Sequence, residues 1–397
     1  MKNSNKKAVV PIMLVFLIMG FGDVVGPMVS LVKDSFGVSN FLAQLLTFSG
    51  FIMFGILSVP MGIYQDKKGK KHTLLIGLSI AFIGLLIPII GGMYGKLNIE
   101  GNTNTLFYII LVSVLMLGAG ATILQVAGNP VMRDVSPEGR YSSNLSFAQS
   151  IKAIGSSLGF LLPPLAAMYL NLDWTLLFPI YSFIVLITLI WVSGIKIEEK
   201  KVEGEKPASL KSCLMLLKNK FVLIMVLGIF IYVGAEVSMS SQVPILMKDA
   251  FGISGYGLWV SWSLFFLPIL IGRFVGSAVL RVLKAKVFLT ISALLAIAGI
   301  ALMFIGHKYL AFTGIILIGF GFSNIFPLIF SITIDKLPER ANELSGLMVT
   351  AIVGGALIPP ITGLVADHTS TLFGFIVPMI CIFYIIIISL LKFNKVK

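Results

Sequence analysis

The sequence predicts an all-α membrane protein in which twelve membrane-spanning helices form two pseudo-symmetric bundles of six. Three observations predict this class. The chain is 57% hydrophobic and only 12% charged, whereas a soluble domain carries roughly 25% charged residues. Runs of about 20 apolar residues recur along the whole chain, and each can cross a ~30 Å hydrocarbon layer as a helix. The third observation is an internal repeat, described below.

The apolar runs define the twelve predicted spans. Their ranges are 9–32, 42–65, 72–94, 105–132, 142–170, 174–195, 220–247, 254–280, 287–306, 309–334, 342–366 and 371–391. Glycine and proline lie inside several of these runs, as at Gly26-Pro27 and Pro163-Pro164. Membrane helices tolerate these residues, which often mark bends.

The basic residues predict the orientation of the chain. With the N-terminus assigned to the cytoplasm, 24 of the 30 lysines and arginines lie in cytoplasmic segments and four lie on the opposite side. This positive-inside bias predicts a multi-pass protein of the cell (cytoplasmic or inner) membrane with both termini in the cytoplasm. It also accounts for the formal charge of +13 without a nucleic-acid partner.

The longest polar stretch separates six spans from six. It predicts an N-terminal bundle of residues 1–195, a cytoplasmic linker of residues 196–219 and a C-terminal bundle of residues 220–397.

The two halves repeat short motifs in the same order. Lys-Asp-Ser-Phe-Gly-Val-Ser at 33–39 matches Lys-Asp-Ala-Phe-Gly-Ile-Ser at 248–254. An Asp, Pro-Glu, Arg pattern ends at Arg140 in one half and at Arg340 in the other. Parallel repeats of six spans build one large class of transporters, whose solute site lies where the halves meet. We therefore expect a transporter of a small polar solute.

The loop after the second span reads Gly-Ile-Tyr-Gln-Asp-Lys-Lys-Gly-Lys-Lys from Gly62, with Asp66 and Gly69 at fixed offsets. It matches the signature of the major facilitator superfamily: glycine, three residues, aspartate, a basic residue, any residue, glycine and two basic residues. The eighth span keeps a relic in Gly276, Arg281 and Lys284. The chain resembles this superfamily, and the resemblance implies the major facilitator fold.

Further motifs along nearly the whole chain resemble the fucose permease branch of sugar–cation symporters. They lie at residues 22–27, 125–130, 148–149, 232–235, 271–276 and 352–355. The resemblance implies a secondary active carbohydrate transporter that imports a monosaccharide, a hexose or deoxyhexose, by alternating access with H⁺ or Na⁺ as the coupled ion.

The same resemblance implies roles for individual residues. In that branch an aspartate of the first span and a glutamate of the fourth carry the coupling of proton and sugar, and these positions are Asp23 and Gln125 here. An asparagine usually stands three residues after the fifth-span glutamine, Gln149, and here that residue is Lys152. Glu236 stands where the branch often has glutamine. Relative to that branch, the ionisable side chains therefore stand at different positions in the spans.

Of the 30 basic and 17 acidic side chains, four lie well inside predicted spans: Asp23, Lys152, Glu236 and Arg273. A charge at the bilayer centre costs ~2.5–3.5 kcal/mol, so such residues face protein or a water-filled cavity and pair with one another. Asp23 is expected to be a coupling carboxylate or an acceptor for sugar hydroxyls, or else half of a permanent ion pair. Lys152 is expected to pair with Asp23 or Glu236 and release it when cation or sugar binds, unless it is a static strut.

Glu236 is expected to be a second coupling carboxylate or a packing partner of Arg273 or Lys152. Tyr232 precedes it by one helical turn and is expected to be a substrate or coupling residue as well. Trp262 is expected to offer its ring face to the apolar C–H surface of a sugar, or to lie in an interfacial aromatic belt.

Three amides complete the predicted substrate and coupling residues: Gln125, Asn129 and Gln149. An amide donates and accepts hydrogen bonds, which suits a sugar hydroxyl. The same amides could instead form hydrogen bonds between helices. Gating or structural braces are expected at six positions: Gly62, Asp66, Gly69, Arg140, Arg273 and Arg340.

The sequence carries no phosphate-binding glycine loop, metal cluster or nucleophile–base motif. We therefore expect no enzyme, no cofactor beyond a coupled H⁺ or Na⁺, and a monomer whose partners are a sugar and membrane lipids. An ammonium at position 152 can take the place of a bound cation, so a sugar uniporter is an alternative function. An efflux antiporter of the same superfamily and a transport-inactive nutrient sensor are further alternative functions. A membrane enzyme is the least favoured class.

Overall fold

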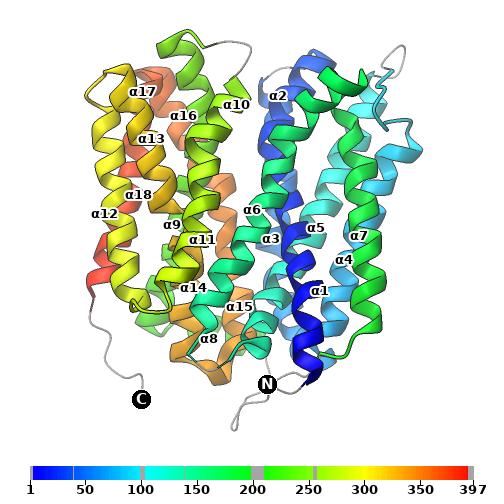
Figure 1. The fold of residues 1–397 in the computed structure, drawn as a ribbon, viewed down its shortest axis with the longest axis vertical. Helices are drawn as coiled ribbons and strands as arrows, with labels where there is room; N and C mark the ends of the chain where they lie inside the picture. The colour runs from blue at the N-terminus through cyan, green and yellow to red at the C-terminus, as the bar shows by residue number, and fades with distance from the viewer. Residues whose placement is uncertain are drawn as a thin grey trace. The chain divides into compact units, whose positions relative to one another are not determined.

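The computed structural model describes residues 3–38, 40–98, 103–137, 139–197, 210–253 and 257–391. The regular structure of these residues is helical throughout, with no strand among them. The α-helices of Figure 1 are α1 (Asn3–Met19), α2 (Val25–Phe36), α3 (Asn40–Lys68), α4 (Lys70–Ile90), α5 (Thr103–Val135), α6 (Tyr141–Leu165), α7 (Leu177–Gly194), α8 (Leu210–Leu216), α9 (Lys220–Phe251), α10 (Gly257–Ser261), α11 (Leu267–Val279), α12 (Ala285–Met303), α13 (Lys308–Phe322), α14 (Ile325–Lys336), α15 (Ala341–Thr350), α16 (Gly354–His368), α17 (Thr371–Gly374) and α18 (Ile376–Leu390).

Twelve helical stretches of the described residues are long and apolar enough to cross a membrane, which confirms the predicted number. The stretches are Ala8–Val29, Leu45–Lys68, Lys70–Ile90, Thr103–Val135, Tyr141–Leu170, Trp174–Gly194, Lys220–Pro244, Trp259–Val279, Ala285–Met303, Lys308–Lys336, Glu343–Ala366 and Thr371–Leu390. The third ends four residues earlier than predicted, because Gly92 turns the chain at a φ of 87°. Residues 254–256 of the eighth predicted span lie outside the described residues.

Several spans contain a segment in which the backbone departs from a regular α-helix. The first span changes to a 3-10 segment at Gly20–Val24, and the eleventh at Ala351–Val353. The eighth contains a π-helical turn at Trp262–Phe266, and the tenth breaks between α13 and α14 at Ser323-Asn324. Broken helices are tolerated at membrane depth where the backbone is buried in protein or lines a water-filled cavity. Three of these breaks hold or adjoin polar residues discussed below.

The chain divides into two compact units. One comprises Met1–Val135 with Ile151–Lys201, and the other comprises Ser136–Ser150 with Val202–Lys397, within the described ranges. The division runs through α6. The boundaries predicted from sequence, 1–195, 196–219 and 220–397, are not tested by it and stay predictions.

The internal repeat extends to packing and backbone conformation. The most extensive helix pair of the first unit is α4 with α5, and that of the second is α12 with α13, which are the third and fourth spans of each half. The repeated Lys-Asp motif contains Gly37 in one half and Gly252 in the other, with φ values of 63° and 65°. Glycine is the residue that adopts this left-handed conformation at no steric cost, which explains its place in both copies.

Within the first unit, two glycines bring the first span against α6. A Cβ atom on Gly20 would lie 2.2 Å from the carbonyl oxygen of Lys152, and one on Gly155 would lie 2.0 Å from that of Leu17. Small residues at a membrane helix crossing let the two backbones approach closely. This crossing places Asp23 beside α6.

Replacing Gly155 with alanine is expected to destabilise the protein by about 1–3 kcal/mol, because the added methyl group has to push two backbones apart. Gly194→Ala is the matched control, since a Cβ there meets no atom within 4 Å. Thermal unfolding in detergent measures both variants. Equal midpoints for Gly155→Ala and Gly194→Ala would contradict this account of the crossing.

Candidate functional site

Asp23 and Lys152 form an ion pair within the first unit. Lys152 Nζ lies 3.1 Å from Asp23 Oδ2, and the Ser156 hydroxyl donates to the same oxygen at 2.8 Å. Lys152 and Ser156 lie one turn apart on α6, so one helix face supplies both donors. The carboxylate is carried by the 3-10 segment of the first span, which the glycine crossing holds against that face.

The pair is only partly enclosed. The Asp23 side chain is 33% exposed and that of Lys152 is 13% exposed. Both contacts go to Oδ2, and Asp23 Oδ1 has no hydrogen-bond partner among the described residues. A carboxylate oxygen accepts hydrogen bonds and binds cations, so Oδ1 is open to a hydroxyl group, a proton or a metal cation.

Arg273 and Glu236 form an ion pair within the second unit. Arg273 Nη2 lies 3.4 Å from Glu236 Oε1. The same guanidinium donates from Nε to the Ser323 carbonyl at 3.0 Å and from Nη1 to the Gln149 carbonyl at 3.1 Å. Arg273 is buried, and three of its nitrogens donate to three different acceptors. Its position is therefore fixed more firmly than that of Lys152.

The break in the tenth span holds the helix that carries Arg273. Asn324 donates from Nδ2 to the Gly272 carbonyl at 2.7 Å. A Cβ on Gly276 would lie 2.3 Å from the same amide, so the glycine makes room for it. Sequence reasoning did not single out Asn324 or Ser323. The signal was present in Asn324 itself, which is an amide inside the tenth predicted span.

The three predicted amides are all buried. Gln125 Oε1 in the first unit and Gln149 Nε2 in the second have no hydrogen-bond partner among the described residues. Leaving a buried polar atom unsatisfied costs about 1–3 kcal/mol. Gln125 and Gln149 thus each hold one side-chain atom that is unsatisfied within the described residues, and Asn129 is fully buried in α5.

The two predicted aromatic residues have different surroundings. Tyr232 is fully buried and donates its hydroxyl to the Phe322 carbonyl at 2.7 Å, next to the break in the tenth span. Trp262 begins the π-helical turn of the eighth span, and its Nε1 donor has no partner among the described residues. Trp262 thus keeps a free donor, and Tyr232 does not.

The signature loop after the second span is held by a buried ion pair. Gly69 adopts a φ of 88° at the start of α4, which explains a glycine at this motif position. The next residue, Lys70, lies with Nζ 2.6 Å from Asp134 Oδ2 at the end of α5, and both side chains are buried. Gly62 is buried and Asp66 is half-buried in the last turns of α3. The loop therefore ties α4 to α5.

The two repeated arginines differ. Arg340 donates to the Glu343 carboxylate, with Nη2 2.8 Å from Oε1, and this hydrogen bond raises the pKa of Arg340 above its ordinary value. The Ser212 hydroxyl donates to the same carboxylate, so α8 is tied to α15. Arg140 is exposed.

The described residues contain no group of three or more His, Cys, Asp or Glu side chains that could hold a metal ion. Both cysteines, Cys213 and Cys381, are buried, and they form no disulfide with each other. Besides the pair of Lys70 and Asp134 at the ends of two spans, the described residues hold the ion pairs of Asp23 with Lys152 and of Glu236 with Arg273 farther inside the spans, together with unsatisfied amide and indole groups. Twelve spans with such groups in their interior are typical of a polytopic membrane transporter.

Residues 12–360 match the family model of the Major Facilitator Superfamily, and the chain belongs to this family. It is a transporter and not an enzyme.

A glucose/galactose transporter of Brucella abortus is 27% identical over 89% of this chain and 86% of its own length. An L-fucose-proton symporter of Haemophilus influenzae is 25% identical over 95% of each chain. The crystal structure of FucP in the outward conformation superposes with a TM-score of 0.80, at 20% identity over 98% of this chain and 99% of that chain. The resemblance found in the sequence is confirmed.

Asp134→Asn is expected to lower stability by about 3–5 kcal/mol, because it leaves the buried Lys70 ammonium without its counter-charge. The double variant Lys70→Met/Asp134→Asn should recover much of this loss, and Lys67→Gln, which alters an exposed lysine, is the control. Unfolding in a denaturant titration measures all three variants. A double variant no more stable than Asp134→Asn would show that the pair does not act as a unit.

Proposed function

We propose that this chain is a secondary active transporter that imports a monosaccharide, a hexose or deoxyhexose, by alternating access, with H⁺ or Na⁺ as the coupled ion. The names of the relatives support the sugar, and one relative is a proton symporter. The single observation that carries the proposal is the half-open ion pair of Asp23 with Lys152. A bacterial inner membrane with both termini in the cytoplasm is the proposed location, supported by the distribution of basic residues.

The two ion pairs have different roles in this proposal. Arg273 is a planar donor that stays charged and is used by three acceptors, so we assign the Glu236 pair a bracing role. Lys152 is a flexible point charge that meets one carboxylate oxygen and keeps partial access to water. The pair of Asp23 and Lys152 is therefore the one that opens during transport.

Opening this pair provides the coupling. A proton or Na⁺ that binds Asp23 displaces the Lys152 ammonium, which then turns to the water that its partly exposed side chain already reaches. The bound cation takes over the neutralisation of the carboxylate. A ligand shifts a conformational equilibrium only by its different affinities for the two states. The bound cation supplies that difference, because it binds the carboxylate in the state in which the pair is open, where the carboxylate would otherwise be bare.

Sugar recognition is assigned to the unsatisfied polar atoms of each unit. In the first unit these are Asp23 Oδ1 and Gln125 Oε1, both acceptors. In the second unit they are Gln149 Nε2 and Trp262 Nε1, both donors. A sugar hydroxyl donates and accepts, so it can satisfy atoms of either kind. Tyr232 is assigned to the support of α9 next to Glu236, because its hydroxyl is already used.

One observation favours a second candidate function, a sugar uniporter. The Lys152 ammonium already stands 3.1 Å from Asp23, where a coupled cation would bind. In a uniporter the lysine would permanently replace the cation, and sugar would equilibrate without accumulating. The two candidates differ in the response of uptake to an ion gradient.

Uptake of glucose, galactose and fucose into proteoliposomes, with pH and Na⁺ gradients imposed independently, tests the proposal. We expect one of these sugars to accumulate above its external concentration under one of the gradients. Equilibration without accumulation under either gradient would leave the uniporter. Efflux of lipophilic cations with no sugar uptake would instead support an antiporter.

Asp23→Asn is expected to abolish gradient-driven accumulation, because the amide cannot exchange a proton or hold a cation as a carboxylate does. Exchange of labelled for unlabelled sugar should persist. Asp335→Asn, which removes an exposed carboxylate at the end of α14, is the control and should accumulate normally. Accumulation by Asp23→Asn at the normal level would remove Asp23 from the coupling mechanism.

Lys152→Asn is expected to make uptake depend more steeply on the imposed gradient, because Asp23 then has no internal cation and needs an external one. Lys308→Asn, at an exposed lysine, is the matched control. The ratio of initial uptake rates with and without the gradient is the readout. An unchanged ratio, together with a lower thermal midpoint, would mean that Lys152 is a static strut.

A further inference from the structure

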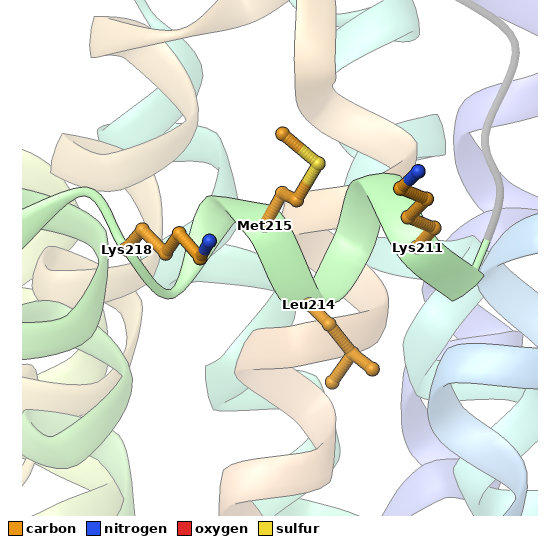
Figure 2. Close-up of a pocket in the computed structure, with 4 residues that line it drawn as sticks. All are labelled: Lys211, Leu214, Met215 and Lys218. Atoms are coloured by element: carbon orange, nitrogen blue, oxygen red, sulfur yellow. The ribbon is translucent and has the colours of Figure 1, made fainter.

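The short helix α8 (Leu210–Leu216) and the turn after it present one uncommitted face. Four residues share that face: Lys211, Leu214, Met215 and Lys218. Their spacing of three, four and seven residues puts them on one side of a helix. Figure 2 shows the two lysines at the ends of this stripe, with Leu214 and Met215 pointing to either side between them. These four residues line a shallow hollow.

The opposite face of α8 anchors the helix to the second unit. Cys213 and Leu216 are buried. The Ser212 hydroxyl donates to the Glu343 carboxylate, and Arg340 Nη2 donates to the Ser212 carbonyl at 3.4 Å. By contrast, Leu214 and Met215 are each 53% exposed, and both lysines are exposed. One face of α8 thus packs against the second unit, and the described residues do not cover the four-residue stripe on its other face.

Two candidate membrane spans begin beside this stripe. The turn after α8 ends at Asn219, whose side chain accepts a hydrogen bond from the Phe221 backbone at 2.9 Å. Lys220 then begins a membrane span, and the span that starts at Glu343 contacts α8 directly. The first residues of two spans thus lie beside α8, and a membrane around these spans would bring its lipid headgroups within reach of the stripe.

We propose that Lys211, Leu214, Met215 and Lys218 bind an anionic phospholipid. Exposed leucine and methionine suit the upper part of an acyl chain, and a lysine at each end of the stripe suits the phosphate and the negative headgroup. The stripe carries no acidic residue. A lysine close to an anionic membrane surface strengthens association about fivefold. This inference does not depend on the proposed sugar transport.

Native mass spectrometry of the full chain in detergent tests the proposal, with phosphatidylglycerol or phosphatidylcholine added. We expect the wild type to retain phosphatidylglycerol in preference to phosphatidylcholine, and Lys211→Gln/Lys218→Gln to lose that preference about tenfold or more. The matched control is Arg281→Gln/Lys284→Gln, which removes two exposed charges from another loop. It should change the preference less than twofold. Thermal midpoints confirm that both variants are folded.

Two further measurements make the outcome decisive. Leu214→Ser/Met215→Ser should lower the retention of both lipids, because it removes the acyl contact. Inorganic phosphate at millimolar concentration should not displace phosphatidylglycerol if a lipid, and not a free anion, is the ligand. Equal losses in the α8 and control variants, or full retention by the α8 variant, would overturn the proposal. Linker residues 198–209, outside the described residues, would then be the candidate to cover the stripe.

Discussion

The central physical constraint on this protein is the cost of holding charge inside a membrane. Four ionisable side chains lie well within the spans, and each is neutralised inside its own compact unit: Asp23 by Lys152 in one and Glu236 by Arg273 in the other. Because each pair is neutral by itself, none of these four side chains is left without a counter-charge. In the proposed mechanism one of these pairs opens, and the cation that enters neutralises the carboxylate that the opening exposes.

The local geometry decides which pair is suited to opening. The guanidinium of Arg273 is held by the Ser323 and Gln149 carbonyls as well as by Glu236, and Asn324 fixes its helix. The ammonium of Lys152 is held by one carboxylate oxygen, and the other oxygen of Asp23 remains open. Both acids stand in corresponding spans of the repeat, but a lysine partner and an arginine partner give them different mobility. The asymmetry between the halves thus follows from the identity of two basic residues.

Much of the fold could be predicted from the sequence because the bilayer imposes strong rules. Length and hydropathy predict the twelve spans to within a few residues, and the repeated glycine of the Lys-Asp motif recurs with the same backbone conformation. The breaks in the first, eighth and tenth spans could not be placed, since glycine and proline mark bends in many positions. The short helix α8 was assigned only to a polar linker, because a seven-residue helix buries too little to leave a clear pattern.

The candidate site was predicted as a set of residues and not as pairs. Sequence reasoning left Lys152 free to meet Asp23 or Glu236, and the glycine crossing at Gly20 and Gly155 is what selects Asp23. That crossing depends on atoms far apart in the chain, so no local pattern reveals it. Tyr232 was assigned to substrate because of its spacing from Glu236, and its bond to the Phe322 carbonyl depends equally on a distant segment.

The most direct measurement of the central claim is an infrared difference spectrum, recorded while the transported sugar is added to the purified protein. A sugar that binds Asp23 Oδ1, in the state in which the pair with Lys152 is open, changes the environment of this carboxylate. The account predicts a carboxylate band in the wild type that persists in Glu236→Gln and disappears in Asp23→Asn. The same band in Asp23→Asn, or its loss in Glu236→Gln alone, would contradict the account.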